Sequence, residues 1–234
     1  MPHAKHPSDG RPDFMVLLGL APPYAVEDVK AAFLAKAKEA HPDHGGSPGQ
    51  FDILQKAFEQ AQQYLDFRSD RRGWIANQMA GYLSVQEVIE TLEEYGAEVT
   101  SDAIDGFKKS FGDFAQLTEK IIGIRLEGAD KADEVICYMV RHAADLGGLI
   151  RLELPHCHLT DAAVLELDAF QQLLHLDLTG TPVTKDATWI VDAILGLETL
   201  NLKGTRVSWW MKRKVQGVLN RRTESRPLSP FAQE

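Results

Sequence analysis

Leucines recur every 24 residues in the last third of the chain, and this spacing restricts the fold more than any other sequence feature. Three copies read LIRLELPHCHLT, LLHLDLTGTPVT and LETLNLKGTRVS, and IIGIRLEGA at 121–129 looks like a fourth. Each copy alternates apolar and polar residues, which is the period of a β-strand, and each is followed by a segment with helical periodicity. One such unit cannot bury its own apolar face, so we expect stacked units that form a curved solenoid.

The unit resembles that of leucine-rich-repeat proteins, in which a strand and a helical segment recur every 20 to 29 residues or so. Cys157 falls at the repeat position that Thr181 and Thr205 occupy in the next two copies. The resemblance implies that this position faces the interior of the turn and that the strands line a concave surface. The polar strand residues there are either ordinary solvent-facing positions or a surface that binds a client or adaptor protein: Arg151, Glu153, His175, Asp177, Thr199 and Asn201.

Two amphipathic helices joined by a tight connection are the second strong feature. Residues 26–40 and 51–66 each carry an apolar stripe at helical spacing, and a short helix is expected over 13–20. The connection lies within KEAHPDHGGSPGQF, where Pro42 cannot continue the first long helix. The resulting bend presents Asp43 at the start of the loop, where its carboxylate can pair with an arginine of a partner.

This order of helix, His-Pro-Asp, glycine-containing loop and helix resembles a J-domain, the DnaJ-type co-chaperone module, over about residues 13–66. The resemblance implies that the loop and the helix before it dock on a DnaK-type chaperone ATPase. Docking would favour the hydrolysis-competent conformer of the chaperone and so stimulate its ATP hydrolysis. The chaperone-binding residues that the resemblance implies are His41, Pro42, Asp43, Lys30 and Phe33.

The first long helix departs from the family pattern in its basic residues. Phe33 stands where tyrosine is common, and Leu34 occupies a position that is often arginine or lysine. Lys36 and Lys38 supply positive charge two or more residues later, at a different angle around the helix. We therefore expect a weaker or re-aimed basic face.

The net charge of −9 is concentrated in the middle of the chain, where residues 74–148 carry 6 basic and 14 acidic side chains. A nucleic-acid-binding protein normally has a net basic domain, so we expect no nucleic-acid partner. No apolar run reaches the roughly 18 to 20 residues of a membrane span, and the presence of only two cysteines favours a reducing, cytoplasmic compartment. One basic cluster is either a solvated helix face or a docking site for something acidic, and it follows Trp209 and Trp210: Lys212, Arg213, Lys214, Arg221, Arg222 and Arg226.

Residue types that serve in catalysis or metal binding occur without the motifs that would use them. His41 with His44, and His156 with His158 beside Cys157, have ligand-like side chains. No Cys-x-x-Cys or His-Glu-x-x-His pattern accompanies them. There is also no phosphate-binding loop, nucleophile triad or suggestive carboxylate pair. We expect no enzymatic activity, no catalytic residue, no metal and no cofactor.

The predicted fold class is multidomain: an all-α J-domain helical hairpin plus a helical connector, then a short α/β leucine-rich-repeat solenoid. In the connector, a helix is predicted from an N-cap at Ser84 to a C-cap at Gly96, with a weaker helix over SDAIDGFKKSFGD. The predicted parts are a disordered N-terminus (1–12), the J-domain (13–70), the acidic helical connector (71–118), the solenoid with a C-terminal capping helix (119–223) and a disordered tail (224–234).

The function that the sequence favours is that of a co-chaperone. The J-domain would dock on a DnaK-type chaperone and stimulate its ATP hydrolysis, while the leucine-rich repeats would select a client or partner. The alternative is a protein-interaction scaffold whose J-like domain does not stimulate the chaperone ATPase.

Overall fold

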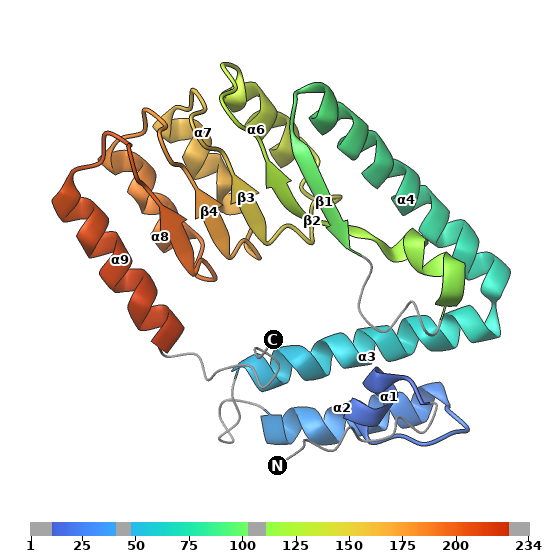
Figure 1. Ribbon diagram of the computed structural model, residues 1–234. Helices are drawn as coiled ribbons and strands as arrows, with labels where there is room; N and C mark the ends of the chain where they lie inside the picture. Colours follow the sequence, from blue (N-terminus) through green and yellow to red (C-terminus); the bar gives the residue numbers. More distant parts are fainter. Residues whose placement is uncertain (1–10, 41–47, 103–110, 225–234) are drawn as a thin grey trace, which may run out of the picture. The chain divides into compact units, whose positions relative to one another are not determined.

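The computed structural model describes residues 11–40, 48–102 and 111–224, which belong to two compact units (Figure 1). The described part of the first unit consists of residues up to 79 and of the segment 111–118. The second unit contains residues 80–102 and 119–224.

The first unit is helical. The helices predicted over 13–20, 26–40 and 51–66 are all present, and α3 begins earlier than predicted because proline is well suited to the first position of a helix. The elements are α1 (Asp13–Leu18), α2 (Val26–Ala40), α3 (Pro48–Ser69), the first part of α4 (Arg71–Glu94) and the 3-10 helix η2 (Gly112–Thr118).

Aromatic side chains hold the first unit together. Phe33 of α2 stacks on Phe58 of α3 with 4.3 Å between the ring centroids. Trp74 of α4 stacks on Phe111 at 5.2 Å, and the rings of Phe67 and Trp74 meet in a T-shaped arrangement at 5.0 Å. Such ring pairs contribute roughly 0.5 to 1.5 kcal/mol each beyond the area that they bury. The core around them contains Phe14, Met15, Leu18, Val29, Leu54, Ala57, Ala61 and Leu65.

The second unit contains a sheet. Within the described residues, five strands lie in the order β1-β2-β3-β4-β5, with β2 to β5 parallel and β1 antiparallel to β2. Helices α6, α7 and α8 form a row beside the parallel strands (Figure 1). The strands are β1 (Glu98–Asp102), β2 (Lys120–Arg125), β3 (Arg151–Glu153), β4 (His175–Asp177) and β5 (Thr199–Asn201). The helices are the rest of α4, α6 (Ala132–Arg141), α7 (Asp161–Leu165), η3 (Glu166–Ala169), η4 (Lys185–Trp189), α8 (Ile190–Ala193) and α9 (Trp209–Glu224).

The repeat spacing sets the register of the parallel strands. Leu152 pairs with Leu176, which pairs with Leu200, so residues 24 apart lie side by side. All three side chains are buried, and each contributes roughly 1.5 to 3 kcal/mol by leaving water. The other two leucine rows are also buried: Leu149, Leu173 and Leu197, and Leu154, Leu178 and Leu202.

Carboxylates join successive helical segments of the second unit. Both oxygens of Asp133 accept hydrogen bonds from Thr160, from its N–H at 3.0 Å and its hydroxyl at 2.8 Å. In the next repeat, Asp161 accepts hydrogen bonds from the N–H of Thr184 at 2.7 Å and from the Thr184 hydroxyl. Each bond ties the helical segment of one repeat to the loop of the next.

The predicted fold class is wrong. The described residues form a mixed α/β fold around a five-stranded mixed sheet, instead of an all-α J-domain and helical connector followed by a leucine-rich-repeat solenoid of like units. The first strand of the sheet, β1, comes from the segment that was predicted to be a helical connector, and it runs antiparallel to β2. It supplies partners for backbone groups that would otherwise form an open sheet edge, and the β-branched Val99 and Thr100 suit a strand.

The helix predicted to begin at Ser84 also starts elsewhere. α4 begins at Arg71 and continues through Ser84, because Asp70 accepts a hydrogen bond from the N–H of Gly73 at 3.0 Å and so acts as the cap. The predicted end is confirmed: Gly96 has φ 85° and donates its N–H to Glu93 at 2.9 Å. Ser101 and the residue after it, predicted to be helical, are the end of β1.

Truncation of one leucine tests the buried rows. Leu176 is 2% exposed, whereas Leu195 is 72% exposed. Leu176→Ala should lower the free energy of unfolding of the second unit by about 2 to 5 kcal/mol, because it leaves a cavity in the core of that unit. Leu195→Ala, the matched control, should change it by less than about 0.5 kcal/mol. Urea unfolding followed by circular dichroism measures both, and equal effects would show that the rows do not stabilise the unit.

Candidate functional site

The connection between α2 and α3 is the first candidate site, because the sequence places His41, Pro42 and Asp43 in it. These three residues lie outside the described residues. The described chain ends on one side at Ala40 and resumes at Pro48, so the site is described through the two helices that carry it.

α2 has two faces with different roles. Its inner face carries Phe33, which is half-buried and stacks on Phe58 of α3 with an interplanar angle of 23°. Its outer face carries Leu34, which is 67% exposed, between the exposed Lys30 and Lys38 four residues to either side. Of the two α2 residues predicted to bind the chaperone, Lys30 therefore lies on the outer face, and Phe33 holds α2 against α3.

Lys36 is used inside the first unit. Its Nζ donates a hydrogen bond of 2.6 Å to the carbonyl oxygen of Leu17, near the end of α1. The last carbonyls of a helix lack partners within it and lie at its negative end, so an ammonium group is favourable there. This contact leaves Lys30 and Lys38 as the exposed cations of α2.

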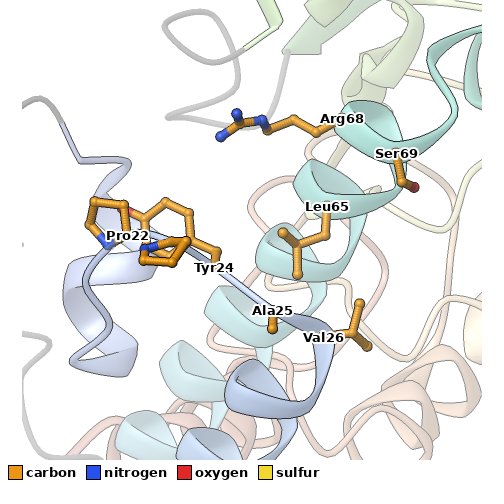
Figure 2. A pocket seen from close by; sticks show the side chains of 8 residues that line it. Pro22, Tyr24, Ala25, Val26, Leu65, Arg68 and Ser69 are labelled. Atoms are coloured by element: carbon orange, nitrogen blue, oxygen red, sulfur yellow. The ribbon is translucent and has the colours of Figure 1, made fainter.

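A pocket with a volume of about 680 Å³ lies between the α1–α2 loop and the C-terminal end of α3 (Figure 2). Pro22 and Tyr24 stand on one side of it, and Leu65, Arg68 and Ser69 of α3 stand on the other. Its walls are therefore mainly apolar and aromatic, with one guanidinium group at the rim.

The polar groups at this pocket have partners that do not activate them for chemistry. The hydroxyl of Ser69 donates to the carbonyl oxygen of Asp66 at 3.1 Å. Arg68 donates to the hydroxyl of Tyr64 at 3.3 Å and lies 5.6 Å from the centre of that ring. A nucleophile needs a nearby general base, and Ser69 instead donates to a backbone carbonyl, so the pocket has the character of a binding groove.

The six strand residues predicted as a partner-binding face are brought together in two rows across β3, β4 and β5. One row is Arg151, His175 and Thr199, and the other is Glu153, Asp177 and Asn201.

These residues bond to one another. Nδ1 of His175 lies 3.0 Å from the hydroxyl of Thr199, and Asn201 donates to Asp177 at 3.2 Å. Arg151 lies 3.5 Å from Glu153. Exposed polar pairs of this kind contribute about 0 to 1 kcal/mol, so a partner could replace them at little cost.

Arg125 of β2, which was not among the predicted residues, belongs to the same face. Its guanidinium donates to Glu153 at 2.7 Å and to Glu127 at 2.6 Å. These hydrogen bonds, with that to Glu153 the stronger influence, raise the pKa of Arg125. The repeat spacing could have indicated Arg125 as a member of this face. It lies in the fourth copy of the repeat, 28 residues before Glu153, and it pairs with Glu153 in the sheet.

The His-Cys-His stretch does not converge on one point. The buried thiol of Cys157 donates to the carbonyl oxygen of Leu126 at 3.1 Å, whereas His156 and His158 are exposed. Across the described ranges, no three His, Cys, Asp or Glu side chains are placed to hold a metal ion. His156 has φ 58° and stands at the turn position that Gly180 and Gly204 occupy in the later copies.

Comparison of the chain with protein-family models, with curated proteins and with solved structures gives no match. Among the helices of the described residues, none combines the length and apolar character needed to cross a membrane.

Neighbouring residues of α2 allow a test of its two faces. Phe33→Ala should destabilise the first unit by about 2 kcal/mol, because it removes a ring that is stacked and half-buried. Leu34→Ala should change its stability by less than about 0.5 kcal/mol, since Leu34 is exposed. Hydrogen exchange of the α2 and α3 amides reports on this unit alone, and faster exchange in the Leu34 variant would contradict the assignment of the faces.

The two thiols should differ in reactivity. Burial raises the pKa of the Cys157 thiol, which keeps it protonated at pH 8, whereas Cys137 is exposed on α6. Because disulfide reagents react with the thiolate, Ellman's reagent should label one thiol per native chain and both after denaturation. Cys137→Ser should abolish native labelling, and a Cys157 that reacts as fast as Cys137 would contradict the burial of its side chain.

Proposed function

We propose that the chain is a co-chaperone that docks on a DnaK-type chaperone ATPase and stimulates its ATP hydrolysis. The observation that carries the proposal is the packing of α2 on α3 on either side of the His-Pro-Asp segment. Two helices fixed to each other by the Phe33–Phe58 stack would hold the two ends of that segment at a set separation.

The outer face of α2 supplies chemistry suited to docking. An exposed leucine between two exposed lysines offers an apolar contact with cations on both sides. The cations would steer an acidic partner surface towards the helix, and Leu34 would be desolvated in the complex. The carboxylate of Asp43 would then pair with an arginine of the chaperone.

Stimulation follows if the chaperone's ATP-bound, hydrolysis-competent conformer binds this surface more tightly than its other conformers. A ligand shifts a conformational equilibrium only by its difference in affinity for the two states. No group of this chain takes part in the hydrolysis itself under the proposal, so the chain would not be an enzyme.

The polar face of β2 to β5 would select the client or partner in this proposal. Several of its side chains pair with one another and are partly exposed, so a partner could exchange these pairs for its own. We place the protein in the cytoplasm, because both cysteines are free and one of them is exposed.

A second function is favoured by the contact of Lys36. A basic patch that lost this cation to the carbonyl of Leu17 would dock more weakly, as in an interaction scaffold that does not stimulate the chaperone. The same ATPase measurement separates the two functions.

Asp43→Asn should abolish stimulation of the steady-state ATPase of a DnaK-type chaperone from the same organism. The amide keeps the size of the side chain but cannot form a charged pair with arginine. Asp28→Asn, the same change on the exposed first turn of α2, is the matched control and should stimulate like the wild type. Unchanged circular dichroism of both variants shows that folding is not the cause. Full stimulation by the Asp43 variant would refute the proposal, and no stimulation by the wild type would favour the scaffold.

A further inference from the structure

The outer face of α9 carries exposed tryptophans beside cations. Trp209 is 67% exposed and Trp210 is 74% exposed, in the first turn of the helix. The guanidinium of Arg213 lies 5.6 Å from the ring centre of Trp209, and the exposed Lys214 follows. Tryptophan and arginine are enriched among the few residues that contribute most of the binding free energy in protein–protein interfaces.

The inner face of α9 is fixed to the second unit. Val215 and Leu219 are buried in its core. Arg222 donates to the carbonyl oxygens of Val191 at 2.8 Å and Ile194 at 3.2 Å. The orientation of α9 is therefore set, and its tryptophans are held outward.

The outer face of α4 has the opposite charge. Val88 and Leu92 are buried on its inner side. At the positions opposite them, Leu83 is 60% exposed, and the exposed glutamates of the same stripe are Glu87, Glu90 and Glu94. Within the described residues these three glutamates make no ion pair, and the last turn of α4 contains no basic residue. Each face thus begins with an apolar residue and continues with charge of one sign.

Both charged faces oppose the dipole of their own helix. The C-terminal end of a helix is negative, yet α4 places Glu90 and Glu94 there; the N-terminal end is positive, yet α9 places Arg213 and Lys214 near it. At each of these helix ends, the side-chain charges therefore have the same sign as the end of the helix dipole. The two ends suit each other, because both the side-chain charges and the dipoles are of opposite sign.

We propose that the chain associates head to tail, with the outer face of α9 of one copy docked on the outer face of α4 of a second copy. The two helices stand at opposite ends of the row of strands in the second unit (Figure 1). A docked pair therefore keeps one free α4 face on one copy and one free α9 face on the other, which makes the contact heterologous and open-ended. A net charge of −9 disfavours an anionic membrane as the occupant, whereas a second copy brings the acidic face itself.

Charge reversal tests this contact in the full chain. The α9 variant is Arg213→Glu with Lys214→Glu, and the α4 variant is Glu90→Lys with Glu94→Lys. Both place charges that favour their helix dipole, so neither should unfold the protein. The matched control is Glu166→Lys with Asp168→Lys, which changes the charge of exposed residues of η3 by the same amount and in the same direction as the α4 variant.

By sedimentation equilibrium at low salt, the average mass of the wild type and of the control should rise about twofold or more with concentration. It should return to that of one chain in about 1 M salt, where charge interactions are screened within about 3 Å. Each of the two reversal variants should stay a single chain. Their equimolar mixture should associate as the wild type does, because one variant supplies a native α4 face, the other supplies a native α9 face, and the two reversed faces are again of opposite charge. The chain with all four changes should associate again.

Three results would overturn the proposal. One is a wild type that stays a single chain at every concentration. Another is association that the α4 variant retains, since the partner face would then lie elsewhere. The third is cosedimentation of the wild type with phosphatidylserine vesicles that the α9 variant loses, since an anionic membrane would then occupy the α9 face.

Discussion

The packing of leucine side chains between neighbouring parallel strands is the interaction on which the second unit depends. β3, β4 and β5 are each 3 residues long, and strands of that length do not form a stable sheet by themselves. Their register places Leu152, Leu176 and Leu200 in one buried row, so each copy completes the core of the one before it. Everything carried by these strands, including the polar face on their other side, is positioned by that row.

A stack of this kind leaves two ends, and the chain covers them differently. At one end β1 pairs with β2 and fills its open edge, with the buried side of α4 packed on the same core. At the other end α9 packs Val215 and Leu219 on the last repeat. α4 and α9 bury their apolar sides in the core, so the side chains on their opposite sides are exposed. The acidic outer face of α4 and the aromatic, basic outer face of α9 follow from this arrangement.

Much of the local structure could be predicted from the sequence. The spans of α2 and of the repeat strands, and the end of α4 at Gly96, depend on periodicity and on proline or glycine at particular places. The start of α4 could not be predicted from the apolar pattern. Its cap is Asp70, fourteen residues before Ser84, which was the predicted N-cap. The strand β1 was missed because it forms only against β2, and its own sequence reads equally well as a polar connector. Of the candidate site, the six strand residues were predicted as one face, but Arg125, which bonds to Glu153, was not.

The sequence by itself determined the spans of α2 and of the repeat strands and which leucines come together, since these depend on spacing along the chain. It also placed His-Pro-Asp between two helices. Only the tertiary structure decided that Lys36 bonds to the end of α1, that the polar strand residues satisfy one another, and that charges of opposite sign face outward from the two ends of one sheet. The physical reason is that these contacts join residues far apart in the chain, whose meeting depends on the packing of the whole unit and leaves no local pattern in the sequence.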